Sequence, residues 1–258
     1  MSKIITIAGQ KGGTGKSITA VNLAASFALF EKKTLLIDCD PQGCSTQWTG
    51  ISKKDYNCDI ASILSGRSKV VDAIVNTNLD YLDIIPAGFT LFNVALKLAK
   101  NPGNEKLLRL FLQDIQDTEQ YGYEYIIIDP PSSHSFLSVS AMTASDFLLV
   151  CMSAQYNCLE DFHGLLKMVK HIKANHKVHL KIAGFLFNRC ETKKQIKTFL
   201  TNHKLLGIEQ MVFDNFIPED DNIQKTIDLK VPVLLNDIKS KAATAYLNFA
   251  QELHFFFN

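Results

Sequence analysis

The sequence has no long apolar segment. No run of hydrophobic residues approaches the roughly 18 that a membrane-spanning helix needs. The first residues, Met1–Lys3, pass directly into an apolar run and leave no room for the pattern of a signal peptide. We therefore expect a protein without a spanning helix or a leader, and we expect it in the cytosol.

The sequence also has little excess charge of either sign and no closely spaced pair of cysteines. Its formal net charge is +1, so the total charge does not indicate a nucleic-acid partner, and any basic surface must be local. The six cysteines are scattered and form no Cys-x-x-Cys pair. In a chain expected in the cytosol, this distribution is typical of reduced, mostly buried thiols.

Short apolar runs alternate with stretches of helical periodicity along all 258 residues. The alternation predicts an α/β fold, with a mostly parallel central sheet covered by helices on both faces. A chain of this length can bury a full core as one domain, residues 1–258. The predicted strands are 3–8, 34–38, 82–85, 124–128, 146–152, 181–187 and 212–217. The predicted helices are 17–31, 91–99, 104–120, 136–144, 159–175, 193–204, 222–228 and 239–254.

A glycine-rich loop, Lys-Gly-Gly-Thr-Gly-Lys-Ser, lies between the first predicted strand and the first predicted helix. In this context the backbone N–H groups and the helix N-terminus bind a phosphate, which predicts a P-loop NTPase fold. Lys16 would reach the β- and γ-phosphates, and the Ser17 hydroxyl would hold Mg²⁺. The loop departs from the usual motif, because Gln10 replaces its first glycine and Lys11 is an additional lysine. The predicted nucleotide-binding residues of this segment are Lys11, Gly12, Gly13, Thr14, Gly15, Lys16, Ser17 and Ile18.

Three aspartates lie at or just after the ends of predicted strands, where ligands bind in sheets of this kind. Asp129 ends a strand of apolar residues and fits the role of the acidic group that holds the hydration shell of Mg²⁺. Asp40 would orient or activate the attacking water, and Asp38 would support the metal shell. The alternative for each aspartate is a helix N-cap.

These motifs together resemble the ParA/MinD family of deviant-Walker P-loop ATPases. The segment Asp38–Gly43, which reads Asp-Cys-Asp-Pro-Gln-Gly, is similar to the ParA (Soj-like) branch, and the resemblance runs from Ile4 to about Leu253. It implies that Asn188 and Arg189 contact adenine and that the loop at Pro218 covers the base. It also implies the short form of the family, a single ATPase domain without an N-terminal helix-turn-helix extension.

The resemblance further implies a nucleotide-dependent homodimer. Its cofactors would be ATP and Mg²⁺, and Lys11, Lys16 and Asp40 would act in a slow, partner-stimulated hydrolysis. Lys11 would cross the dimer interface to the nucleotide of the other subunit, where a second cation stabilises the charge that develops on the phosphoryl group. The implied partners are non-specific DNA and a ParB-like centromere-binding activator, and the implied function is partition of plasmid or chromosomal DNA.

Two segments differ from the family pattern. The second switch usually reads Asp-x-Pro-Pro, whereas here Asp129 is followed directly by Pro130 and Pro131. The loop after Pro218 usually continues with basic residues, whereas here it is acidic, Glu219–Asp221. We therefore expect no DNA contact from the loop that follows Pro218.

Basic residues are concentrated between positions 163 and 204. This stretch holds ten Lys or Arg residues against Glu191 alone, a formal charge of +9, so the rest of the chain is about −8 when +9 is subtracted from +1. Lys193, Lys194 and Lys197 lie together on one predicted helix and are the predicted DNA-binding residues. The alternative is an ordinary solvated helix face. The corresponding alternative function is a MinD-like ATPase that positions a protein cargo or acts at a membrane surface.

Overall fold

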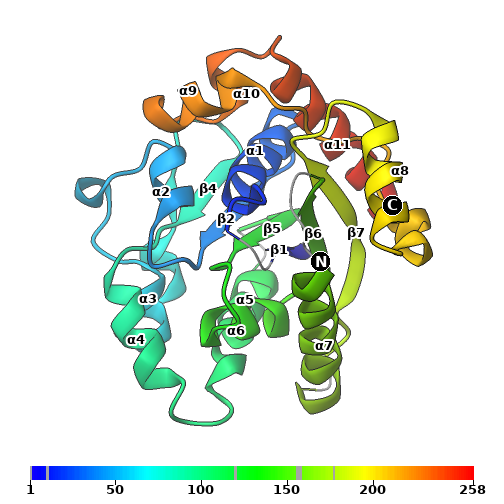
Figure 1. Ribbon diagram of the computed structural model, residues 1–258. Coiled ribbons are helices and arrows are strands. Elements are labelled where there is room, and N and C mark those ends of the chain that lie inside the picture. The colour runs from blue at the N-terminus through cyan, green and yellow to red at the C-terminus, as the bar shows by residue number, and fades with distance from the viewer. Residues whose placement is uncertain (1, 10–11, 119–120, 155–158, 177) are drawn as a thin grey trace.

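A seven-stranded sheet forms the centre of the computed structural model (Figure 1). The structure describes residues 2–9, 12–118, 121–154, 159–176 and 178–258. The strand order is β3-β4-β2-β5-β1-β6-β7, and only the short edge strand β3 is antiparallel to its neighbour. The strands are β1 (Lys3–Ala8), β2 (Thr34–Asp38), β3 (Val75–Asn76), β4 (Leu82–Ile85), β5 (Tyr125–Asp129), β6 (Phe147–Ser153) and β7 (Lys181–Asn188). The predicted mostly parallel sheet is confirmed.

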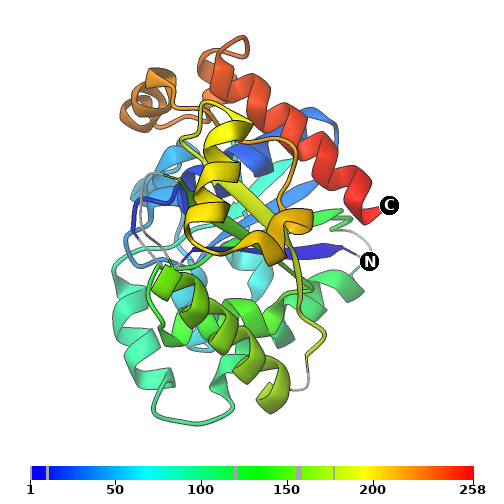
Figure 2. The same cartoon turned by 45° about the vertical axis from the view of Figure 1, so that its right-hand side comes forward.

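Helices cover both faces of this sheet (Figures 1 and 2). One face carries α1 (Lys16–Leu29), α10 (Val233–Asn236) and α11 (Lys241–Phe257). The other face carries α3 (Ile60–Leu64), α4 (Thr90–Leu98), α5 (Leu107–Asp117), α6 (Phe136–Ala144) and α7 (Leu159–His176). The remaining helices are α2 (Cys44–Trp48), α8 (Lys193–Asn202), α9 (Asp221–Leu229), η1 (Lys53–Asp55), η2 (Val70–Ala73), η3 (Asn104–Lys106) and η4 (Leu206–Met211).

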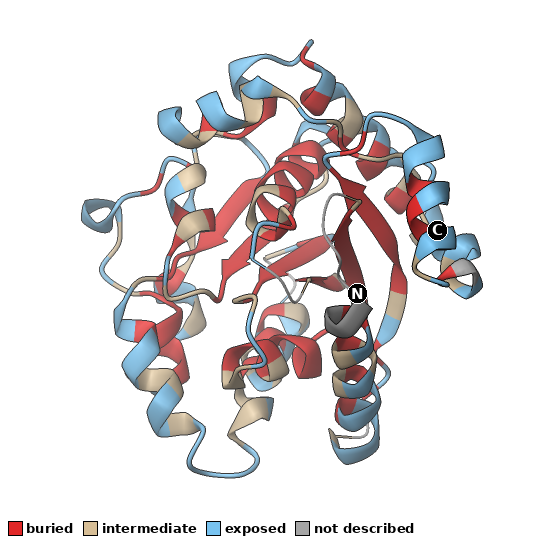
Figure 3. Cartoon of the chain, in the orientation of Figure 1, coloured by how far each residue is buried: buried red, intermediate tan, exposed pale blue. Residues whose placement is uncertain are grey.

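The central strands are apolar on both sides because each side packs against helices. In β5, Ile127 packs against the α1 face, whereas Ile126 and Ile128 pack against the opposite face. All five residues of β5 and all five of β2 are buried, and Figure 3 shows this buried sheet between partly exposed helices. The parallel register places Asp38 directly beside Asp129 at the carboxyl ends of these strands.

The predicted strand at 212–217 is wrong. This segment forms only two parallel bridges to β7, Phe185 to Val212 and Asn188 to Ile217. Between them the backbone N–H groups of Asp214 and Asn215 donate instead to the Glu252 carboxylate of α11, at 2.7 and 3.0 Å. The Glu252 side chain thus accepts hydrogen bonds from two backbone N–H groups in a segment that, as a continuous strand, would donate to the neighbouring strand.

The final helix packs on the sheet over most of its length. Leu253 is fully buried, and the Phe257 ring lies 4.5 Å from that of Phe147 between centroids, whereas Phe255 and Phe256 are exposed. Across the described ranges, no helix combines the length and apolar character that crossing a membrane would require.

Candidate nucleotide-binding site

The glycine-rich loop leads from β1 into α1. Gly13 and Gly15 have φ angles of 86° and 85°, in the left-handed region that glycine adopts without strain. A Cβ on Gly15 would lie 2.6 Å from Asn188 Nδ2, so this position also excludes larger residues on steric grounds. No described side chain caps the first turn of α1, which leaves its N–H groups available to an anion.

Lys16 begins α1 and is 8% exposed. Its ammonium group lies near Asp129 and opposes the rise that burial causes in the pKa of that carboxyl. Gly12 is exposed in the same loop, Thr14 is buried, and Ser17 and Ile18 are half-buried. Lys11 lies outside the described residues, so its predicted position across a dimer interface remains a prediction.

Asp38 has both carboxylate oxygens engaged by the loop and helix that follow it. Oδ1 accepts a hydrogen bond from the Asp40 N–H at 3.0 Å. Oδ2 accepts hydrogen bonds from the Thr46 N–H and the Thr46 hydroxyl, each at 2.8 Å. The side chain is fully buried, and its hydrogen bonds join β2 to the first turn of α2.

Asp129 is equally buried but has one oxygen without a hydrogen-bond partner. Oδ2 accepts a hydrogen bond from the Ser45 hydroxyl at 2.6 Å. Oδ1 accepts none within the described part of the chain, although the Ser17 hydroxyl is close enough to oppose the rise that burial causes in the pKa of Asp129. An unpartnered buried carboxylate oxygen beside Ser17 is the arrangement that a magnesium hydration shell would complete.

Burial raises the pKa of both carboxyls. The pKa of Asp38 is raised to about 7, first by burial and then by the charge of Asp129. The pKa of Asp129 is raised to about 6 by burial, against the lowering effects of Ser45, Ser17 and Lys16. A divalent cation would stabilise both charged forms, so the charge distribution of this site also fits Mg²⁺.

Asp40 lies on the loop between β2 and α2 and is half-buried. Its Oδ1 accepts a hydrogen bond from the Gln42 N–H at 3.0 Å, which closes a turn within the loop. The turn ends at Gly43, whose φ is 66°, and a Cβ there would lie 3.0 Å from the Ala87 carbonyl oxygen. The structure therefore places Asp40 on a tightly folded loop next to the two buried carboxylates.

A pocket of about 220 Å³ adjoins the glycine-rich loop. Eight of the predicted nucleotide-binding residues line it: Gly13, Gly15, Lys16, Ser17, Ile18, Asn188, Arg189 and Pro218. Asn188 connects β7 to the loop, because its Nδ2 donates to the Thr14 carbonyl oxygen at 2.7 Å. Its Oδ1 is buried and accepts no hydrogen bond within the described residues, so it is available to a ligand donor.

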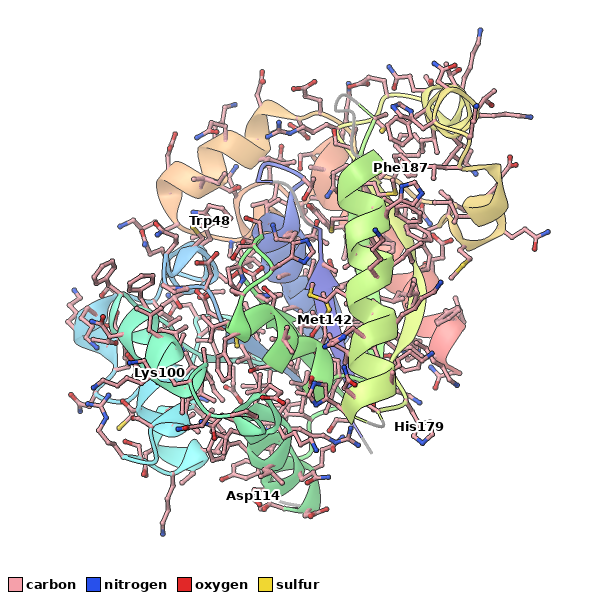
Figure 4. The ribbon with its side chains drawn as sticks, turned by 60° about the horizontal axis from the view of Figure 1, so that its bottom comes forward. Trp48, Lys100, Asp114, Met142, His179 and Phe187 are labelled. Atoms are coloured by element: carbon pink, nitrogen blue, oxygen red, sulfur yellow. The ribbon has the colours of Figure 1, made fainter. Side chains whose placement is uncertain are left out.

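The sequence did not reveal the wall of the pocket that α9 provides. Ile223, Gln224 and Ile227 of α9 line the pocket, together with Trp48 of α2 and Tyr246 of α11. Figure 4 shows Trp48 beside α9. Trp48 both packs and faces the pocket, since it is half-buried against the core and lines the pocket. The helical periodicity of residues 222–228 predicted a helix, but nothing local indicated that it covers this site.

The predicted DNA-binding lysines are exposed on α8. Lys193, Lys194 and Lys197 point away from the buried face of α8, which consists of Ile196, Phe199 and Leu200. The Lys193 ammonium is paired with Asp214 at 2.7 Å, so part of its charge is neutralised. The basic stretch is also divided in space, because α7 and α8 lie apart in both views (Figures 1 and 2).

A mostly parallel sheet with a glycine-rich loop before α1, and buried aspartates at the ends of β2 and β5, defines the class of P-loop nucleoside triphosphatases. A family model described as an AAA domain matches residues 2–182. The chain is 32% identical to the sporulation initiation inhibitor protein Soj of Bacillus subtilis, with 98% of each chain covered. It is also 32% identical to the chromosome partitioning protein ParA of Caulobacter vibrioides NA1000, covering 97% of this chain and 93% of ParA. The chain belongs to the ParA/MinD family of P-loop ATPases.

Solved structures show the same fold with nucleotides bound. A candidate plasmid partition protein of Borrelia burgdorferi B31, bound to AMPPNP, superposes with a TM-score of 0.79 at 26% identity, covering 100% of this chain and 98% of that one. The septum site-determining protein MinD of Pyrococcus horikoshii OT3, complexed with Mg-ADP, gives 0.80 at 23% identity, covering 98% and 96%. The second likeness concerns the fold alone.

Proposed function

We propose that this chain is a ParA-like ATPase that binds Mg·ATP, dimerises around two nucleotides and binds DNA non-specifically. A ParB-like centromere-binding protein would stimulate hydrolysis, so that plasmid or chromosomal DNA is partitioned. The observation that carries the nucleotide part is the juxtaposition of the open glycine-rich loop, buried Lys16 and the free oxygen of Asp129. The partition part rests on the relatives at 32% identity, one of which is a chromosome partitioning protein.

The geometry supports a role for each of these residues. Lys16 would contact the β- and γ-phosphates, while Ser17 and Asp129 Oδ1 would hold Mg²⁺ and its waters. Mg²⁺ would supply charge neutralisation at the phosphate oxygens. Asp38, whose oxygens are taken by protein donors, would support this shell indirectly by fixing the loop that carries Asp40. Asp40 would orient the attacking water.

The base would enter the pocket between Asn188 and α9. Asn188 Oδ1 would accept a hydrogen bond from the exocyclic amino group of adenine, a donor that guanine lacks at that position. Arg189 and Pro218 line the same pocket.

The decisive residue for the nucleotide loop is Lys16. We expect Lys16→Ala to weaken ATP binding by at least about 100-fold, because it removes the one buried cation among the described residues that faces the phosphate site. Calorimetric titration with Mg·ATP measures this loss. Lys32→Ala, which removes a lysine from a partly exposed ion pair with Glu124, is the matched control and should bind ATP normally.

DNA binding would use the α8 lysines in each subunit of the dimer, which makes the affinity sensitive to nucleotide state. We expect the double variant Lys194→Glu/Lys197→Glu to abolish the shift of a non-specific duplex at low salt, with ATP binding unchanged. The matched control is Lys97→Glu/Lys100→Glu on the distant α4 end, which changes the net charge equally. If wild-type protein with Mg·ATP leaves the duplex unshifted, the proposed role in DNA partition is contradicted.

The second candidate is a cargo-positioning ATPase that acts on a protein or a membrane surface. The ion pair of Lys193 with Asp214 favours it, because it reduces the basic charge of α8. The acidic loop after Pro218 is weaker support, since Asp220 caps α9 and also accepts a hydrogen bond from the Ala242 N–H at 2.9 Å. The same gel shift separates the two candidates.

A further inference from the structure

Two adjacent hydroxyl residues of α2 each hold one of the two buried carboxylates. Ser45 donates to Asp129 at 2.6 Å, and Thr46 donates to Asp38 at 2.8 Å. Ser45 and Thr46 are themselves buried, at 0% and 3% exposure. We propose that Ser45 and Thr46 are positioning residues, with Ser45 setting the magnesium requirement and Thr46 fixing the loop of Asp40. This inference rests on the proposed function.

The role of Ser45 follows from the two oxygens of Asp129. Because Ser45 occupies Oδ2, the side chain is held in the rotamer that leaves Oδ1 unpartnered beside Ser17. Without the Ser45 hydroxyl, Asp129 could rotate and present either oxygen. Outer-shell partners of this kind orient metal-binding carboxylates, and their loss typically reduces metal affinity by about 10- to 100-fold.

The role of Thr46 follows from a chain of hydrogen bonds. The Thr46 hydroxyl donates to Asp38 and accepts from the Ala87 N–H at 3.0 Å. Asp38 in turn accepts from the Asp40 N–H. Thr46 therefore connects the loop that carries Asp40 to the segment after β4, and its hydroxyl acts both as a donor and as an acceptor.

The two residues follow the Asp40 loop directly, since α2 begins at Cys44. Any change in that loop would therefore move both hydroxyls, and with them the geometry of both carboxylates. These two hydrogen bonds, from Ser45 to Asp129 and from Thr46 to Asp38, would make α2 the element that couples the loop to the proposed metal site. Trp48, the single tryptophan of the chain, also lies on α2 and lines the pocket, so its emission reports the packing of this helix.

The test of Ser45 measures metal dependence rather than activity. The protein is titrated with Mg²⁺ in the presence of a fluorescent N-methylanthraniloyl ADP, and the half-saturating Mg²⁺ concentration is read from the bound nucleotide. We expect Ser45→Ala to raise it about 10-fold or more, with nucleotide affinity in EDTA unchanged. Ser45→Thr, which keeps the hydroxyl, should restore the wild-type value.

The matched control is Ser140→Ala on α6. Ser140 is equally buried, and its hydroxyl has no hydrogen-bond partner within the described residues, so its removal costs no contact with a carboxylate. A wild-type magnesium requirement in Ser45→Ala, or an equal increase in Ser140→Ala, would overturn the inference. If Ser45→Thr does not fold, as judged by thermal melting and Trp48 emission, the comparison of the two alanine variants decides alone.

The test of Thr46 compares the effect of a substitution on kcat with its effect on the KM for ATP. Thr46→Val should lower kcat about 10-fold while leaving the KM for ATP and the magnesium requirement within about twofold, because it displaces Asp40 rather than the nucleotide. The Ala87 amide, having lost its acceptor, should exchange with deuterium faster. Thr46→Ser should recover both values, and Thr143→Val, which removes another buried hydroxyl without a described partner, should change neither.

The outcomes separate this inference from the proposed function. Failure of the wild-type protein to bind Mg·ADP would contradict the function itself. Binding by the wild type with no difference between Ser45→Ala and Ser140→Ala would contradict the inference alone. A fall in kcat that Thr46→Ser does not recover would show a packing effect and would remove Thr46 from the proposal.

Discussion

At the scale of single residues, burial and charge oppose each other at Asp129. The protein keeps a carboxyl with a raised pKa in its interior, where a hydrophobic or amide side chain would be more stable. The motifs indicated this residue and Lys16 from the sequence, because strand–loop–helix patterns fix their positions locally, whereas Asn188 was implied by the family resemblance. They did not indicate Ser45 or Trp48, whose contacts depend on how α2 folds back over β2 and β5.

The burial of the ionisable Asp129 carboxyl predicts that Asp129→Asn stabilises the metal-free protein. The folded-state pKa is raised from 3.8 to about 6, so folded protein binds more protons than unfolded protein between these values. Stability therefore falls as pH rises through this window, by up to about 3 kcal/mol. The amide avoids this cost and can still accept the Ser45 hydrogen bond.

The measurement is urea unfolding in EDTA. At about pH 8 we expect Asp129→Asn to be more stable than wild type by about 1–3 kcal/mol, and at about pH 4 the difference should largely disappear. The same variant should lose the magnesium dependence of nucleotide binding. If Asp129→Asn is less stable than wild type at about pH 8, the ionised Asp129 carboxylate does not destabilise the folded protein, and the prediction is contradicted.

At the scale of elements, the hydrophobic periodicity of the sequence was sufficient to predict a strand where neighbouring strands and helices bury it. The strands β1, β2, β4, β5, β6 and β7 agree with the predicted runs to within about a residue. The segment 212–217 has the apolar residues of a strand, yet Glu252 on α11 takes its N–H donors, and that contact joins residues distant in sequence. Short elements such as α2 and β3 hold too few residues to show a period.

The Glu252 contact predicts a measurable contribution to stability. Glu252 accepts from the backbone of Asp214 and from the backbone and side chain of Asn215. Glu252→Ala removes three hydrogen bonds to a carboxylate and should lower the free energy of unfolding by about 1–3 kcal/mol. Gln251→Ala, at an exposed neighbouring position, is the control and should change it by less than about 0.5 kcal/mol. Equal effects of the two variants would show that helix propensity, not the contact, is measured.

At the scale of the whole molecule, the proposed function requires a second copy of the chain. The pocket is bounded by the glycine-rich loop, β7 and α9, and the described residues offer the phosphates one buried lysine. A second cation would come from Lys11 of another copy, a role implied by the family resemblance. The net charge of +1 and the composition do not bear on this proposed assembly.

The most direct measurement is the mass of the protein in solution by size-exclusion chromatography with light scattering, in Mg·ATP and in Mg·ADP. We predict that Asp40→Ala, which we expect to bind ATP without hydrolysing it, has twice the monomer mass with Mg·ATP and the monomer mass with Mg·ADP. Adding Lys11→Ala to this variant should return it to the monomer mass while Mg·ATP stays bound. A monomeric Asp40→Ala with ATP bound, or a double variant that still dimerises, would contradict the account.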